Sequence, residues 1–399
     1  MSGSDLGGVT PRAESRTFGT RPASTRPAYI EVDLDAIRSN VRVLAELAAP
    51  AAVCAVVKAN GYSHGAVRVA AAALEGGAKW LAVAVVEEGL ELRDSGIDAP
   101  ILVLTQPGYS AASTAVAARL TPTVDTAAGI ARFAELAAAS GRPLAVHLKV
   151  NTGMNRVGAA PRDTVGLART IVDDPFLDLG GVYTHLAVAD EPDRPETGDQ
   201  LDRYDDVLGR LGAAGIDPGL RHAANSAGAI AHPRSRLDLV RCGIAVYGLA
   251  PSPELRAGGF NGCAELTPAL EVRAAVSFVK QIEAGEGVSY GLRYVADRPT
   301  TVATVPLGYA DGIDRRLGLT GGEVLLGGRR RRIAGTVTMD QLMIDCGDDV
   351  VAVGDEVVLI GRQGDEVVTA TEWAERLGTI AYEVICRFGP RLPRRYVGG

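Results

Sequence analysis

The chain has 399 residues and a formal net charge of −7, with 41 Lys and Arg against 48 Asp and Glu. This length is enough for a barrel of roughly 250 residues followed by a smaller domain. The negative charge argues against nucleic acid or an anionic membrane as a partner, because both are bound through clustered cations. No apolar run reaches the roughly 18 residues of a membrane-spanning helix, so we expect no membrane partner.

The five cysteines lack C-x-x-C spacing, and the five histidines show no metal-ligand spacing. We therefore expect no metal and reduced thiols, which are typical of a reducing compartment. Residues 1–26 are rich in Ser, Thr, Arg, Pro and Gly and lack the apolar core of a signal peptide. The sequence thus predicts a disordered leader on a cytoplasmic protein.

Ordered structure is expected to begin with a short alternating strand at 28–33 and a helix that Asp33 caps. Eight apolar runs then alternate with amphipathic helices, a pattern typical of parallel strands buried on both faces. The expected strands are 53–57, 81–85, 101–104, 121–124, 145–150, 179–184, 220–224 and 239–246. Eight such strands close into a (β/α)8 barrel, so we assign residues 27–264 to an α/β barrel of this type.

The pattern changes after residue 265, where short strand-like stretches are separated by Gly and Asp turns. Residues 265–399 are therefore predicted to form a separate, mostly-β domain. Its expected strands are 270–282, 301–306, 323–327, 332–337, 341–345 and 356–360, followed by a helix at 369–377. The basic run Arg329–Arg332 lies next to a Gly-Gly pair, and we interpret it as a solvated hairpin tip rather than a binding patch.

Polar side chains follow several of the eight apolar runs, at the end of the barrel where chemistry is usually found. The positions are Lys58, Lys149, His185, Asn225 with Ser226, and Arg241 with Gly243 and Ile244. Each has a simpler use: a lysine ending a strand is usually solvated, a lone histidine is often structural, and Asn225-Ser226 can simply cap a helix. Their collection at one end is better evidence for a site than any one of them.

Together these residues suggest pyridoxal 5′-phosphate (PLP). Such barrels often bind phosphate in the loops after the last two strands, where Ser226, Gly243 and Ile244 lie. A lysine such as Lys58 bonds covalently to the aldehyde of PLP, and the ring withdraws electrons from the substrate carbon. Arg241 stands where most such enzymes place a carboxylate against the pyridine nitrogen. An arginine cannot accept that proton, so the ring stays a weaker electron sink that suits a plain proton exchange.

The segment from Ala55 to Gly65, which contains Val56-Val57-Lys58-Ala59-Asn60-Gly61-Tyr62, resembles the lysine signature of bacterial alanine racemases. The match extends from about Tyr29 to Val397. Further blocks agree in order at 147–154, 183–185, 224–227, 241–248, 288–291, 308–312, 339–343 and 382–384. The resemblance implies a homodimer with composite active sites that interconverts L- and D-alanine for peptidoglycan synthesis.

The same resemblance implies roles for individual residues. Lys58 would hold PLP and act as one acid–base group, while Tyr290 from the other subunit would act on the opposite face of the substrate. Cofactor contacts are implied for Tyr62, Arg156, His185, Asn225, Ser226, Arg241, Gly243, Ile244 and Tyr382. His185 would lie by the ring and link Arg241 to the Tyr290 phenol.

Substrate contacts follow from the resemblance as well. Arg156 would bind the substrate carboxylate together with the backbone N–H of Met339 from the other subunit. Tyr309, also from the other subunit, would narrow the entrance. Lys149 would be carbamylated, as is frequent in this family, and would orient Arg156.

Some positions depart from the family pattern without removing a catalytic group. Ser63, Asn151, Thr336 and Thr338 stand where glycine, aspartate, arginine and cysteine are usual. They leave the carbamylation of Lys149 and the breadth of amino-acid substrates open.

The predicted function is therefore a PLP-dependent alanine racemase, with a broader or pathway-specific racemase, for example of serine, as the alternative. A PLP decarboxylase fits less well, because Arg241 weakens the electron sink. A non-enzymatic PLP-binding barrel would lack the C-terminal domain that this chain has.

Overall fold

The computed structural model describes residues 26–260 and 262–399. They form two compact units, one built from 32–270, 380–386 and 396–399, and the other from the remaining described residues. The predicted leader lies outside the described residues except for Arg26. Its guanidinium donates hydrogen bonds of 2.6 Å to both carboxylate oxygens of Asp311 and one of 2.7 Å to the carbonyl of Pro306.

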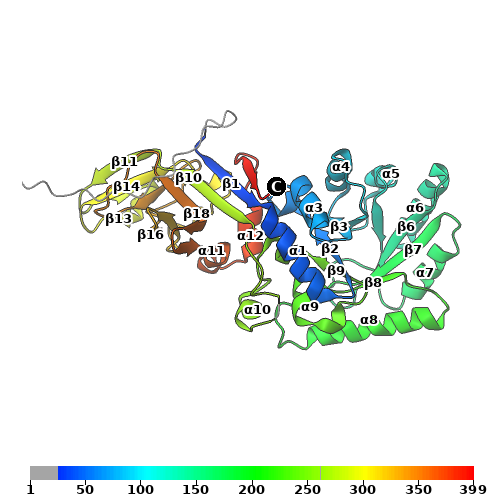
Figure 1. The fold of residues 1–399 in the computed structure, drawn as a ribbon. Coiled ribbons are helices and arrows are strands. Elements are labelled where there is room, and N and C mark those ends of the chain that lie inside the picture. Colours follow the sequence, from blue (N-terminus) through cyan, green and yellow to red (C-terminus); the bar gives the residue numbers. More distant parts are fainter. Residues whose placement is uncertain (1–25, 261) are drawn as a thin grey trace, which may run out of the picture. The chain divides into compact units, whose positions relative to one another are not determined.

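The unit that contains Lys58 is the predicted α/β barrel, and its eight expected strands are confirmed (Figure 1). All neighbours are parallel, in the order β8-β7-β6-β5-β4-β3-β2-β9. Backbone hydrogen bonds from Asp238 to Arg221 and from Arg241 to Ala224 join the two ends of this order, so the barrel is nearly closed. The strands are β2 (Ala52–Val56), β3 (Trp80–Val83), β4 (Ile101–Val103), β5 (Thr121–Val124), β6 (Leu144–Lys149), β7 (Leu177–Tyr183), β8 (Leu220–His222) and β9 (Leu239–Cys242).

Helices lie outside these strands (Figure 1). The side chain of Asp33 caps α1 by accepting the N–H groups of Asp35 and Ala36, and α1 packs against α3 and β2. The helices are α1 (Leu34–Ala48), α3 (Ala66–Glu75), α4 (Val86–Asp94), α5 (Tyr109–Ala117), α6 (Ala127–Ser140), α7 (Thr164–Val172), α8 (Glu196–Ala213) and α9 (Ser226–Ala231). The short helices α10 (Pro253–Ala257) and α12 (Ala381–Cys386) also belong to this unit. Tyr382 thus belongs to the barrel unit although it lies near the end of the sequence.

The second unit is mostly β, as predicted. One sheet has the order β16-β15-β18-β10-β1-β20 with β19 on β18, a second has the order β11-β14-β17, and β12 pairs with β13. β1, which the sequence analysis placed with the barrel, therefore pairs in this sheet. The strands are β1 (Ala28–Asp33), β10 (Leu270–Ala275), β11 (Phe278–Ile282), β12 (Gly287–Val288), β13 (Tyr294–Val295), β14 (Thr300–Val305), β15 (Glu323–Leu326), β16 (Arg329–Arg332), β17 (Leu342–Asp345), β18 (Glu356–Gln363), β19 (Glu366–Val368) and β20 (Arg394–Val397).

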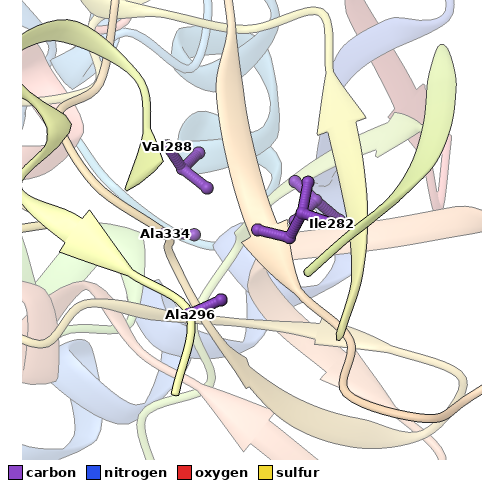
Figure 2. Close-up of a cluster of buried hydrophobic side chains, with 5 residues drawn as sticks. Ile282, Val288, Ala296 and Ala334 are labelled. Atoms are coloured by element: carbon purple, nitrogen blue, oxygen red, sulfur yellow. The ribbon is translucent and has the colours of Figure 1, made fainter. Parts of the chain in front are cut away.

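A small apolar cluster supports the part of this unit that carries Tyr290. It consists of the buried side chains Ile282, Val288, Ala296, Val302 and Ala334 (Figure 2). Val288 lies two residues before Tyr290, so the cluster fixes the start of that loop.

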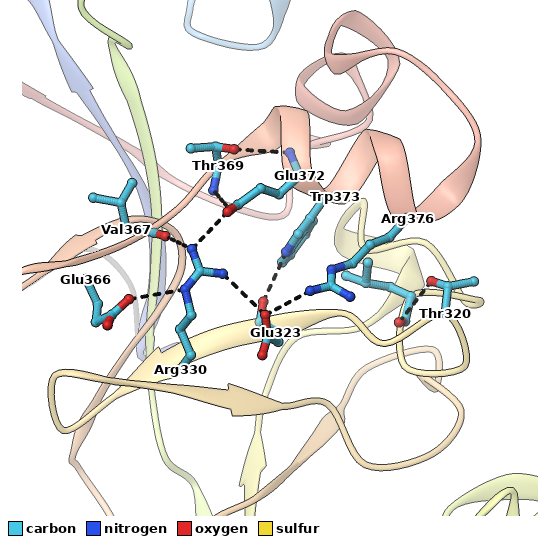
Figure 3. A network of polar contacts seen from close by, with 10 residues as sticks. Thr320, Glu323, Arg330, Glu366, Val367, Thr369, Glu372, Trp373 and Arg376 are labelled. Atoms are coloured by element: carbon cyan, nitrogen blue, oxygen red, sulfur yellow. Dashed lines mark hydrogen bonds and ion pairs between the residues drawn. The ribbon is translucent and has the colours of Figure 1, made fainter. Parts of the chain in front are cut away.

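The basic run Arg329–Arg332 is strand β16, and the interpretation as a solvated tip is wrong. The tip is Gly327-Gly328, where both residues have positive φ. The guanidinium of Arg330 contacts the carboxylates of three residues at 2.9–3.2 Å (Figure 3), namely Glu323, Glu366 and Glu372. These contacts connect β16 to β15, to β19 and to α11 (Ala370–Leu377).

Candidate active site

Lys58 lies two residues after the last residue of β2, and the chain then makes a left-handed turn. Ala59, Asn60 and Gly61 have φ of 53°, 52° and 59°, and Tyr62 and Ser63 also have positive φ. Because a left-handed conformation costs a non-glycine residue roughly 1–2 kcal/mol, several local contacts must hold this turn. The sequence predicted a turn here but not its hand.

The side chains of Glu88 and Asn60 hold the turn. Glu88 of α4 accepts the N–H of Ala59 at 2.6 Å through one carboxylate oxygen, and the N–H of Ala84 at 2.8 Å through the other. The side-chain carbonyl of Asn60 accepts the N–H of Ala66 at 3.0 Å, at the start of α3. These contacts therefore fasten the turn after Lys58 to the ends of β2 and β3.

Ser63, for which the sequence offered no role, also belongs to this arrangement. Its side chain is buried, and its hydroxyl donates to the carbonyl of Cys386 at 3.2 Å. The contact fastens the end of the turn to α12, the helix that carries Tyr382.

Two lysine amines at the strand ends have lowered pKa values. Burial and the nearby Arg156 lower the pKa of Lys58, which favours the neutral amine that attacks an aldehyde. Burial, Arg241 and Arg156 lower the pKa of Lys149 to about 8. The Lys149 amine donates to the carbonyl of Leu104 at 3.0 Å.

The loops after β8 and β9 form a cradle with Tyr62 and Tyr382. The hydroxyl oxygen of Ser226 accepts the N–H of Gly243 at 2.9 Å, and the Tyr62 and Tyr382 ring centres lie 6.4 Å apart. A Cβ added to Gly243 would lie 2.4 Å from the Tyr62 hydroxyl, so only glycine leaves room there. Burial raises the pKa of both phenols, which therefore keep their protons and can donate to an anion.

Asn225 has the simpler role that its position allows, as the cap of α9. Its side-chain carbonyl accepts the N–H of Gly228 at 2.9 Å. The cap fixes the start of the helix whose first residue is Ser226. Asn225 therefore positions the cradle, and the described contacts assign it nothing more.

Arg241 is only 3% exposed and is held by uncharged acceptors. It donates to the carbonyls of Thr184 and Ala223 at 2.7 and 3.0 Å and to Nδ1 of His222 at 2.8 Å. One guanidinium nitrogen also lies 3.3 Å from Nδ1 of His185, as the expected proximity requires. Burial, Arg241 and the nearby Lys149 lower the pKa of His185 well below its ordinary value, so its imidazole is neutral.

Arg156 follows a turn that Asn151 organises. The side-chain carbonyl of Asn151 accepts the N–H groups of Gly153 and Asn155 at 3.2 and 2.9 Å, and its amide donates to the side chain of Asn155. Asparagine replaces the usual aspartate without loss, because every one of these contacts can be made by an amide. Lys149, Arg156, Thr184 and His185 line one small pocket.

Tyr290, Tyr309 and Met339 lie in the other unit, and these residues are 71%, 42% and 53% exposed. Thr336, which replaces the usual arginine, donates to the carbonyl of Tyr290 at 3.0 Å. Tyr309 begins a short turn that the Arg26–Asp311 ion pair supports. The expectation that a second subunit brings these three side chains to Lys58 remains a prediction.

Glu88 and the buried pair of His147 and His222 are the site residues that the sequence analysis missed. The signal for Glu88 was its place three residues after Val85, at the start of a predicted helix that follows a strand. Both histidines lie within expected strands, where a polar residue in an apolar run is itself a signal.

The strand ends fit PLP by the chemistry of their side chains. They offer a lysine amine of lowered pKa, a group of hydroxyl and backbone N–H donors, and a buried arginine. The hydroxyls of Tyr62 and Tyr382 have no hydrogen-bond partner among the described residues, which leaves both as donors for an anion.

Comparison with known proteins identifies the family. Residues 32–251 match the family model for the alanine racemase N-terminal domain and residues 269–396 that for the C-terminal domain. The chain is 49% identical to an alanine racemase of Symbiobacterium thermophilum, covering 94% of this chain and 98% of that protein, and 46% identical to one of Frankia casuarinae, covering 92% and 95%. The crystal structure of the alanine racemase from a D-cycloserine-producing Streptomyces lavendulae superposes with a TM-score of 0.89 at 42% identity, covering 94% and 98% of the two chains. The chain belongs to the alanine racemase family.

Proposed function

We propose that this chain is an alanine racemase that uses PLP to interconvert L- and D-alanine. The observation that carries the proposal is the group of Lys58, His185 and Arg241 at one end of a barrel whose neighbouring loops hold Ser226 and Gly243. The proposal is further supported by the family match, which spans both domains at residues 32–251 and 269–396.

In this proposal PLP, when bound, supplies a ring that draws electrons from the substrate Cα and acidifies its C–H bond. Lys58 holds the cofactor and moves a proton on one face of Cα. Tyr290 of the partner subunit moves a proton on the opposite face. Removal on one face and return on the other inverts the configuration, and a single base could not reach both faces.

The other residues bind and orient. The phosphate would be held by Tyr62, Ser226, Gly243, Ile244 and Tyr382, with Asn225 fixing α9. Arg241 would donate to the pyridine nitrogen and keep it without a proton, since a guanidinium cannot give its own proton up. Arg156 and the backbone N–H of the partner subunit's Met339 would bind the substrate carboxylate, and the partner subunit's Tyr309 would narrow the entrance.

Carbamylation of Lys149 is supported by its environment. Only a neutral amine adds carbon dioxide, and with a pKa of about 8 roughly a tenth of this amine is neutral at pH 7. The product would carry a negative charge next to Arg156 and Arg241, both of which lower the pKa of the free amine. A carbamate would therefore relieve the repulsion among these three cations.

A homodimer in the cytoplasm and a role in peptidoglycan synthesis are further parts of the proposal, and both rest on the family. Among the described residues, no helix is long and apolar enough to cross a membrane. Racemisation of serine or other small amino acids alongside alanine is the alternative, and a screen of small L-amino acids by chiral chromatography decides between the two.

Borohydride reduction tests the role of Lys58. Protein incubated with PLP is reduced and digested, and the peptides are analysed by mass spectrometry. We expect the cofactor mass on Lys58, and the matched Lys149→Ala variant should keep that label. Label on any other lysine, or no label and no conversion of L-alanine, would contradict the proposal.

Mixing two inactive variants tests the composite site. Lys58→Ala and Tyr290→Phe each lack one acid–base group, so each homodimer should be inactive. Their mixed dimer has one site with both defects and one intact site, which restores up to about a quarter of the wild-type activity after random reassociation. No recovery in dimers shown to have exchanged subunits would place both groups in one chain.

A further inference from the structure

We propose that His147 and His222 form a neutral brace that positions Arg241, with the protons of both imidazoles fixed on Nε2. The brace adds detail to the proposed function. It rests on that function in one respect only, namely that Arg241 faces the cofactor. Both histidines are positioning residues, because they act through Arg241.

The direction of each hydrogen bond follows from Arg241. A guanidinium only donates, so Nδ1 of His222, 2.8 Å away, must accept and carries no proton. The proton of a neutral His222 is then on Nε2, which lies 2.9 Å from Nδ1 of His147 and donates to it. His147 in turn carries its proton on Nε2, for which the described residues offer no acceptor.

Both rings are held neutral by their surroundings. Burial and Arg241 lower the pKa of His147 to about 3, and they lower that of His222 well below its ordinary value. The further charged group that acts on His222 is Lys149, a cation with the same effect. Protonation of either ring would also place a hydrogen where the neighbouring group already donates.

A glycine in the strand between the two histidines makes room for their rings. β7 lies between β6 and β8, and its Gly181 pairs with His147. A Cβ on Gly181 would lie 2.8 Å from Cε1 of His147, so the glycine allows the rings of β6 and β8 to meet across β7. The ring of Tyr183 stacks on His222 at 4.6 Å with an interplanar angle of 8°, which fixes the plane of that imidazole.

The chemical consequence concerns the charge of Arg241. No described carboxylate forms an ion pair with its guanidinium, whose acceptors are two carbonyls and imidazoles. A neutral brace orients the guanidinium and leaves its positive charge undiminished. A carboxylate in the place of His222 would orient it equally well but would cancel the charge that faces the ring nitrogen.

The tautomers can be observed directly. Protein with isotope-labelled histidine rings gives nitrogen NMR signals for only five histidines, which single substitutions assign. At neutral pH we expect His147 and His222 both neutral and protonated on Nε2, with and without PLP. A proton on Nδ1 of His222, or a doubly protonated ring in either residue, would refute the brace.

Matched substitutions test its effect on the cofactor. His147→Asn keeps an acceptor near Nδ1, whereas His147→Leu has a similar size and removes it. We expect the dissociation constant for PLP to rise about tenfold in the Leu variant, with a shifted absorbance maximum of the bound cofactor, and less than about twofold in the Asn variant. The thermal unfolding midpoint is measured for both, because a merely structural role would change stability without the spectral shift.

Two outcomes separate the brace from the proposed function. Equal PLP affinity and equal spectra in the Leu variant and the wild type would refute the brace and leave the racemase proposal intact. If the wild type bound no PLP but showed the expected tautomers, the brace would stand and the proposed function would fail.

Discussion

Arg241 and Arg330 show two ways in which the same side chain is held. Arg330, in the β-rich unit, contacts three carboxylates, and its charge is neutralised. Arg241, in the barrel, meets only carbonyls and imidazoles, and its charge is not neutralised. Burying an uncompensated cation is costly, so a fold retains one only where something else uses the charge. The comparison separates a structural arginine from a functional one.

Arg241→Lys should have the largest effect, because lysine keeps the charge but loses the fork of donors. We expect kcat/KM for alanine to fall about 100-fold, with a loss of about 1–3 kcal/mol in stability because buried acceptors of Arg241 lose their donors. Racemisation kinetics and thermal unfolding check this. An active variant would show that the charge alone suffices and would remove the contrast with Arg330.

The converse substitution, Arg330→Leu, leaves Glu323, Glu366 and Glu372 facing one another without their shared cation. We expect a loss of about 1–2 kcal/mol in the free energy of unfolding, discounted for partial exposure, and unchanged kcat per folded molecule. Denaturant unfolding measures the loss. The loss should shrink at high salt, which screens the repulsion among the three carboxylates. An equal loss at high salt would attribute it to packing instead.

Local patterns were enough to predict the barrel and to propose most of its candidate site. Buried parallel strands are continuous apolar runs, and a polar residue ending such a run marks the site without any knowledge of distant contacts. Lys58, His185 and Arg241 were found in this way, whereas Tyr290 came only from the family resemblance.

What the sequence did not predict depends on contacts between distant residues. The basic run of β16 next to a Gly-Gly pair is typical of a turn by local pattern, and the three carboxylates that hold Arg330 come from other elements. His147 and His222 meet across β7 because Gly181 of that strand has no side chain to keep the rings apart. β1 joins the β-rich sheet through pairing with β10 and β20, which no local pattern specifies.

Glu88→Gln tests a carboxylate inside the barrel site itself. Glu88 accepts three backbone N–H groups through two oxygens, and glutamine has only one acceptor oxygen. We expect a loss of about 1 kcal/mol in stability. The Glu88 charge also raises the pKa of Lys58, so its removal should lower that pKa further.

The shift is measured in protein without PLP, as the pH dependence of the rate at which an amine-specific reagent modifies Lys58. Because a lower pKa leaves more neutral amine, the rate should reach half its maximum at a lower pH than in the wild type. No shift would mean that Glu88 acts on Lys58 through the backbone alone, and a shift to higher pH would contradict the expected effect of its charge. The matched Glu87→Gln variant, at the exposed neighbour of Glu88, should leave the profile unchanged.

Ala59→Gly should have the smallest effect, and unlike the other substitutions it should raise the stability of the protein. Ala59 holds φ of 53°, which glycine adopts without strain, although glycine also gains freedom in the unfolded chain. Relief of strain of roughly 1–2 kcal/mol outweighs that entropy, and we expect a net gain of about 0.5 kcal/mol. Denaturant unfolding measures it, with Ala66→Gly in the right-handed helix α3 as the control that should lose stability.

The turn after Lys58 is thus strained for a reason other than stability. If Ala59→Gly were both more stable and fully active, the strain would serve no function, and Arg241 alone would remain as a feature retained at the cost of stability.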